Sequence, residues 1–138
     1  MLDNLKTPLV LGGRILLALM FVLSGFDKLA HVQGTAGYIA GVAGLPMPTV
    51  LAVAAGALEL AAGLAIMTGF AARWAALALA AFTLVASLLF HAYWAAPAEQ
   101  QFVQQLLFMK NMAITGGMLI LAALGPGPAS LGSRKQVS

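Results

Sequence analysis

Apolar residues fill most of the 138-residue chain, and short stretches rich in polar residues, Gly or Pro divide them into four long segments. We expect helices over residues 8–27, 48–70, 73–94 and 103–124. About 20 apolar residues are enough for a helix to span the hydrocarbon core of a bilayer. The pattern therefore predicts an all-α integral membrane protein, built as a four-transmembrane-helix bundle with up-down-up-down connectivity.

The longest connection, residues 29–47, lies between the first two segments. Tyr38, Ile39 and Val42 fit one side of a short helix, so we predict a short interfacial helix between helices 1 and 2. At the other end, Gly125-Pro126 stops the last helix. We interpret residues 1–128 as a single membrane domain and 129–138 as a disordered cytoplasmic tail.

Four spans place both termini on the same side of the membrane. Lys6, Arg73, Arg134 and Lys135 fall on that side, whereas Lys28 lies at the opposite surface. Because positively charged residues concentrate in cytoplasmic loops, we predict that both termini are cytoplasmic.

Composition agrees with a membrane protein: 62% of the residues are hydrophobic and only 8% are charged. Soluble domains carry roughly 25% charged residues. The few cations are scattered, which argues against nucleic acid as a partner. The chain has no Cys, and its two His residues are far apart, with His91 the only His inside a span. We therefore expect no metal site, no haem and no Fe–S cluster on this chain.

Glu59 is a carboxylate near the centre of the second apolar segment, where an uncompensated charge costs at least a few kcal/mol. Gly56 and Gly63 share its helix face, so another helix can come close to it. On the first segment, one face carries both cations and two small residues and should turn inward: Arg14, Ala18, Phe21, Gly25 and Lys28.

Two cations are considered as partners for Glu59. Side chains on a helix lean toward its N-terminus, which brings Lys110 toward Glu59 but carries Arg14 toward the cytoplasmic surface. We therefore predict a Glu59–Lys110 pair, and treat Arg14 and Lys28 chiefly as interfacial anchors. Thr83, Ser87 and His91 recur every four residues and either join two helices by hydrogen bonds or form a polar cluster at the interface. The candidate intramembrane polar site comprises Glu59, His91, Lys110, Asn111 and Arg14, with catalytic residues unknown.

Several short motifs over residues 9–124 resemble the DoxX family of small bacterial membrane proteins. They are Arg14-x-x-Leu17, Phe21-x-x-Ser24-Gly25-x-x-Lys28-Leu29, Gly44-Leu45-Pro46, Gly56-x-x-Glu59-x-x-x-Gly63, His91-x-x-Trp94 and Phe108-x-Lys110-Asn111-x-x-x-x-Gly116-Gly117. The resemblance implies a four-helix protein of the bacterial inner membrane. It also implies an association with quinone-linked oxidation, including components of thiosulfate:quinone oxidoreductase. The family supplies no accepted catalytic residues.

Three functions are compatible with these features. The favoured hypothesis is a membrane subunit of a quinone-linked redox system that binds a quinone or a similar small apolar molecule, with an acid such as Glu59 near the ligand. An alternative is a non-enzymatic scaffold or assembly partner for a redox enzyme. The third is a transporter of a small solute or of protons, acting as a homo-oligomer. Whether the chain is itself catalytic stays open; the bilayer is a partner in every case.

Overall fold

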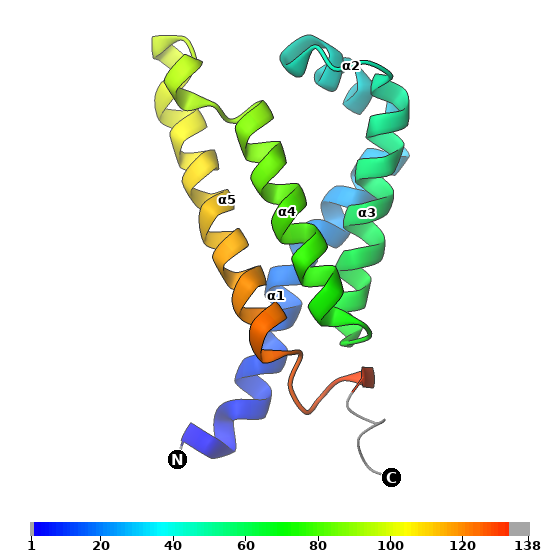
Figure 1. The fold of residues 1–138 in the computed structure, drawn as a ribbon, viewed down its shortest axis with the longest axis vertical. Coiled ribbons are helices and arrows are strands. Elements are labelled where there is room, and N and C mark those ends of the chain that lie inside the picture. Colours follow the sequence, from blue (N-terminus) through cyan, green and yellow to red (C-terminus); the bar gives the residue numbers. More distant parts are fainter. Residues whose placement is uncertain (1, 133–138) are drawn as a thin grey trace.

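The computed structural model describes residues 2–132, which form five α-helices and a short 3-10 helix (Figure 1). Their bounds are α1 Leu2–Ala30, α2 Val32–Ala43, α3 Pro48–Thr68, α4 Ala72–Phe90, η1 Tyr93–Ala95 and α5 Ala98–Leu124. No strand occurs among the described residues, and α1, α3, α4 and α5 are each long and apolar enough to cross a membrane. The predicted all-α fold with four candidate spans is confirmed.

The four long helices alternate in direction, and the start of α1 and the end of α5 lie at the same end of the molecule (Figure 1). The short helix α2 lies across the opposite end, between the end of α1 and the start of α3 (Figure 1). This is the helix that the sequence predicts between the first two spans.

The long helices pack as two pairs rather than as an evenly spaced bundle. The most extensive contacts join α1 to α3 and α4 to α5, whereas α1 and α5 hardly touch. A tight turn joins α3 to α4, and its Gly69 and Ala71 both have positive φ, 80° and 48°. From this turn α4 leans away from α3 toward the α2 end, so the two pairs form the arms of a V (Figure 1).

Small residues allow α1 and α3 to approach closely. A Cβ on Gly25 would lie 2.4 Å from the backbone nitrogen of Leu60, and a Cβ on Gly63 would lie 2.9 Å from Cγ2 of Val22. No larger residue fits at either glycine without moving a helix. The inward faces predicted around Glu59 and along the first span are both confirmed, since their residues are buried apart from the half-buried Lys28.

Two expected helix starts are wrong. Helix α1 begins at Leu2 rather than at residue 8, so Pro8 lies inside the helix. A proline inside a helix removes one backbone hydrogen bond and crowds the carbonyl four residues earlier, but α1 continues through Pro8. Helix α5 begins at Ala98 rather than at 103, after Pro97 at its N-cap. Gln100 and Gln101 are polar but favour helix, so polarity marks a membrane boundary better than it marks a helix end.

Two expected segment ends also differ from the structure. Helix α4 ends at Phe90 instead of 94, and η1 follows it. Residues 129–132 do not form a disordered tail, because Ser130 is buried and the guanidinium of Arg14 donates hydrogen bonds of 2.6 Å to the carbonyls of Pro126 and Ala129. These carbonyls follow α5 and have no helical partner, so they are available to Arg14. The rest of the predicted tail, residues 133–138, lies outside the described residues.

The orientation of this fold in the membrane can be tested with reporter fusions. Fusions at Gly34 in α2 and at Ala98 before α5 should report the periplasm, and a fusion after Gly132 should report the cytoplasm. The reason is the excess of Lys and Arg at the end that carries both termini. Alkaline phosphatase and fluorescent-protein reporters at the three sites check this. A periplasmic signal after Gly132 would contradict the predicted orientation.

Candidate functional site

Three polar side chains meet between α1 and α3, around Glu59. The carboxylate of Glu59 is buried, and its Oε2 lies 2.8 Å from Nζ of Lys28. The hydroxyl of Ser24 donates to Oε1 of the same carboxylate at 3.2 Å, and Nζ of Lys28 also donates to Oγ of Ser24. We call these three residues the Glu59 cluster. Within this cluster, the ammonium group of Lys28 compensates the charge of Glu59, which is the one buried carboxylate among the described residues.

The directions of the two helices explain why Lys28 reaches Glu59. Helical side chains lean toward the N-terminus of their own helix. Helices α1 and α3 run in opposite directions, and Lys28 lies level with Gly56, one turn from Glu59. Lys28 therefore leans back along α1 while Glu59 leans back along α3, and the two charged groups meet between them.

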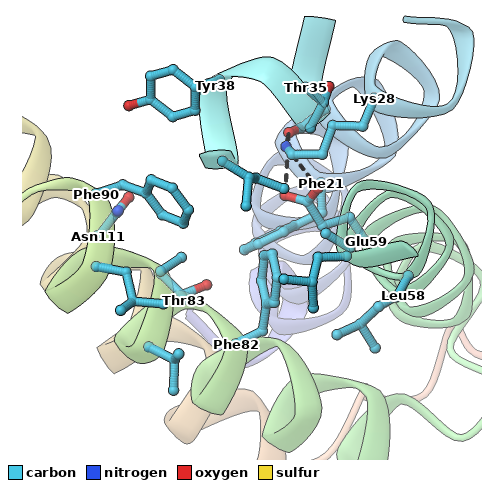
Figure 2. Close-up of a pocket in the computed structure, with 18 of the residues that line it drawn as sticks. Phe21, Lys28, Thr35, Tyr38, Leu58, Glu59, Phe82, Thr83, Phe90 and Asn111 are labelled. Carbon is cyan, nitrogen blue, oxygen red and sulfur yellow. Dashed lines mark hydrogen bonds and ion pairs between the residues drawn. The ribbon is translucent and has the colours of Figure 1, made fainter. Parts of the chain in front are cut away.

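The Glu59 cluster forms part of the wall of a pocket of about 570 Å³ between the arms of the V (Figure 2). Its lining is mostly apolar and comes from all five α-helices, together with Leu45 and His91 in the connections between them. Phe21 and Phe82 contribute aromatic rings, and Ile39, Leu51 and Leu58 contribute aliphatic surface. A volume of 300–1,000 Å³ with few polar groups is typical of sites for small molecules.

The opposite wall of the pocket carries a second group of polar side chains, from α4 and α5. Asn111 donates to the hydroxyl of Ser87 at 2.9 Å, and Nδ1 of His91 lies 2.9 Å from Oε1 of Gln104. Thr83, Asn111 and Phe90 lie across the pocket from Lys28 and Glu59 (Figure 2). At Ser87 and His91, the polar stripe predicted on this span joins two helices by hydrogen bonds.

The pocket is partly open, and several of its apolar lining residues are exposed at the surface of the helices. Val85 and Leu89 on α4 are 56% and 40% exposed, and Met20 on α1 is 42% exposed. In a membrane-spanning helix, exposed apolar residues face the lipid. The opening is therefore suited to molecules that arrive from the bilayer. At the α2 end, Tyr38 and Phe90 stack with ring centroids 5.5 Å apart and join α2 to the end of α4.

The pocket brings together three of the five candidate site residues, Glu59, His91 and Asn111. Arg14 instead holds the segment after α5, as described above. Lys110 is exposed on α5 and does not line the pocket, so the predicted Glu59–Lys110 pair is wrong. Successive helical residues point about 100° apart. Because Asn111 turns inward to Ser87, its neighbour Lys110 turns outward.

The roles of Lys28 and Ser24 in this site were not predicted from the sequence. Lys28 was expected on the inward face of the first span, but as a surface anchor. The same rule of N-terminal lean that was applied to Lys110 would have directed Lys28 toward Glu59. Among the described residues, no three His, Asp or Glu side chains gather as they would at a metal site.

Comparison with known proteins identifies the family of the chain. The DoxX family model matches residues 9–92, which include most of α1, all of α2 to α4 and the whole Glu59 cluster. The chain belongs to the DoxX family. It is 41% identical over 124 residues to inner membrane protein YqjF of Escherichia coli, covering 88% of each chain. It is 36% identical over 129 residues to inner membrane protein YphA of the same organism, covering 94% of this chain and 91% of YphA.

No solved structure matches the chain. These relatives and the four candidate spans show that the chain is a multi-pass inner membrane protein of the DoxX family. The match over residues 9–92 leaves out α5, whereas the notably longer alignments with both E. coli proteins cover about nine-tenths of the chain.

The Glu59–Lys28 pair in this DoxX protein can be tested by a double-mutant cycle. Glu59→Gln and Lys28→Met should each lower the free energy of unfolding by about 1–3 kcal/mol, because each leaves a charged partner uncompensated, half-buried at Lys28 and buried at Glu59. The double variant should lose less than the sum of the two, by at least about 0.5 kcal/mol. Equilibrium unfolding in mixed detergent micelles measures all four proteins.

The matched control for this cycle combines Glu59→Gln with Lys110→Met. Lys110 is also a lysine within a span, but it does not contact Glu59, so the two effects should add to within about 0.5 kcal/mol. Coupling of Glu59 to Lys110 rather than to Lys28 would contradict the site described here.

Proposed function

We propose that this DoxX protein is a membrane subunit of a quinone-linked redox system, and that its pocket binds a quinone or a similar small apolar molecule. The observation that carries the proposal is the joint presence of an apolar pocket of about 570 Å³ and a buried charged cluster on its wall. A pocket that served only to solubilise a hydrocarbon would need no charged group. A pocket for a polar metabolite would not be lined by aromatic and aliphatic side chains.

The Glu59 cluster suits the oxygen atoms of a quinone ring. The ammonium group of Lys28 can donate a hydrogen bond to a carbonyl oxygen, and its side chain is 27% exposed, whereas that of Glu59 is only 6% exposed. Glu59 can exchange a proton with a hydroxyl group at the same place. Both the oxidised and the reduced form of such a ring therefore find a hydrogen-bonding partner.

The exposed apolar lining of the pocket suits a ligand dissolved in the membrane. The exposed lining residues Val85 and Leu89 are apolar, so a hydrocarbon substituent of the ligand can stay in contact with lipid. Because the chain has no Cys, an iron–sulfur cluster or a redox-active dithiol of the system would belong to another subunit. The protein's own part is to bind, orient and protonate or deprotonate the ligand.

The test is equilibrium binding of 2-decyl-1,4-benzoquinone to the purified protein in detergent. Wild-type protein should bind it saturably at one site per chain. Ala86→Phe places a phenyl ring in the pocket and should weaken binding at least about tenfold, because the added ring occupies ligand volume.

The control is Ala123→Phe, the same substitution at an exposed position of α5 outside the pocket, which should leave the affinity unchanged. Absence of saturable binding would contradict the proposal. Equal weakening by Ala86→Phe and Ala123→Phe would also contradict it, since the ligand would then not occupy this pocket.

Lys110 favours a second function, that of a membrane scaffold for a redox enzyme. This lysine is exposed in the middle part of α5, on a face that also exposes Leu106 and Met109. A cation inside a span normally pairs with another group or extends to the interface. A neighbouring protein that offers a carboxylate would satisfy it. A stoichiometric protein partner that is lost in Lys110→Gln, together with no bound quinone, would favour the scaffold over the quinone-binding subunit.

A further inference from the structure

We infer that the pocket recognises its ligand at two ends, and that the hydroxyl of Thr83 is the second end. The ligand class is a ring that carries oxygen atoms at opposite, para positions and a hydrocarbon substituent. The inference rests on the proposed function and specifies the chemistry of that same site. One ring oxygen forms hydrogen bonds with the Glu59 cluster, and the other forms a hydrogen bond with Thr83.

The hydroxyl of Thr83 is an unsatisfied polar group inside the protein. Thr83 is 4% exposed, and its Oγ1 has no hydrogen-bond partner. Buried polar groups are nearly always hydrogen-bonded, and a helical Thr can usually bond the carbonyl four residues back. Figure 2 shows the oxygen of Thr83 directed into the pocket, toward the side on which Glu59 lies. A ligand atom in the pocket would supply the missing partner.

Thr83 and Glu59 lie at nearly the same depth in the molecule. Glu59 lies nine residues before the end of α3, and Thr83 lies eleven residues after the start of α4. At about 1.5 Å per residue, their distances from the turn between these helices differ by about 3 Å. A ligand that lies across the V, rather than along it, can therefore reach both walls.

The space between the two walls suits an aromatic or quinonoid ring. Phe21 and Phe82 line the pocket between Glu59 and Thr83 (Figure 2), and phenyl rings pack favourably against other flat rings. The Thr83 hydroxyl both donates and accepts, so it can bond a carbonyl or a hydroxyl oxygen. Val85 and Leu89, two and six residues further along α4, lead the hydrocarbon substituent toward the lipid.

The experiment compares ligands that differ by one oxygen. They are 2-decyl-1,4-dihydroxybenzene, kept reduced under argon, and the two phenols that each lack one of its hydroxyls, 2-decylphenol and 3-decylphenol. Wild-type protein should bind the diol about tenfold more tightly than the better phenol, the ratio expected from one additional hydrogen bond. Thr83→Val, which keeps the shape of the side chain, should reduce the affinity for the diol to that for the better phenol and leave the latter unchanged.

Two variants serve as controls. Thr83→Ser keeps a hydroxyl and should retain the preference for the diol. Thr115→Val removes another buried hydroxyl, but one that bonds the carbonyl of Asn111 and does not line the pocket, so it should not change the preference. Thr83→Val should fold as well as wild type, because it removes an unsatisfied group.

The outcomes separate this inference from the proposed function. Binding of all three ligands with no preference for the diol, or an equal effect of Thr83→Val on diol and phenols, would overturn the two-ended recognition while a ligand pocket remains. If the diol, the phenols and the quinone all fail to bind, that result contradicts both the inference and the proposed function.

Discussion

Burial of one carboxylate in an apolar interior is the constraint on which this structure depends. Glu59 cannot stay charged between α1 and α3 without a cation, and Lys28 reaches it because the two antiparallel helices direct their side chains toward each other. The contact requires the helix backbones to be close, and Gly25 and Gly63 allow that approach. The charged pair and the small residues therefore depend on one another: a larger residue at either glycine would separate the helices and with them the two charges.

The close α1–α3 pair leaves the α4–α5 pair to form the other half of the molecule. Hydrogen bonds from α5 to Ser87 and between Gln104 and His91 join α4 to α5, while Ala62 and Ile66 of α3 share a buried apolar cluster with the first half of α4. The pocket is the space that results between the two halves, and the stacked rings of Tyr38 and Phe90 connect them at the far end. At the end that carries the termini, Arg14 holds the segment after α5 against the bundle. Polar contacts therefore join α1 to α3, α4 to α5, and α1 to the segment after α5. The pocket lies between the first two of these helix pairs.

Much of the fold could be predicted from the sequence, because apolar length and helical periodicity are strong signals. The inward faces of α1 and α3 followed from the spacing of Arg14, Gly25 and Glu59, and Asn111 and His91 were placed in the site. Which cation pairs with Glu59 was predicted wrongly, because that choice depends on the rotation of α5 about its own axis. Lys110 and Asn111 are adjacent and equally polar, so the sequence does not say which one turns inward. That the hydroxyl of Thr83 is buried without a hydrogen-bond partner follows only from the three-dimensional arrangement.

The most direct test of the central claim is solid-state NMR of the membrane-embedded protein, with 13C in the Glu side-chain carboxyl groups and 15N in the Lys side chains. Because Nζ of Lys28 lies 2.8 Å from Oε2 of Glu59, the account predicts a strong dipolar coupling between this nitrogen and the carboxyl carbon of Glu59. The coupling should disappear in Lys28→Met and in Glu59→Gln and persist in Lys110→Met. Absence of the coupling in wild type, or its persistence in Lys28→Met, would contradict the claim that Lys28 compensates Glu59.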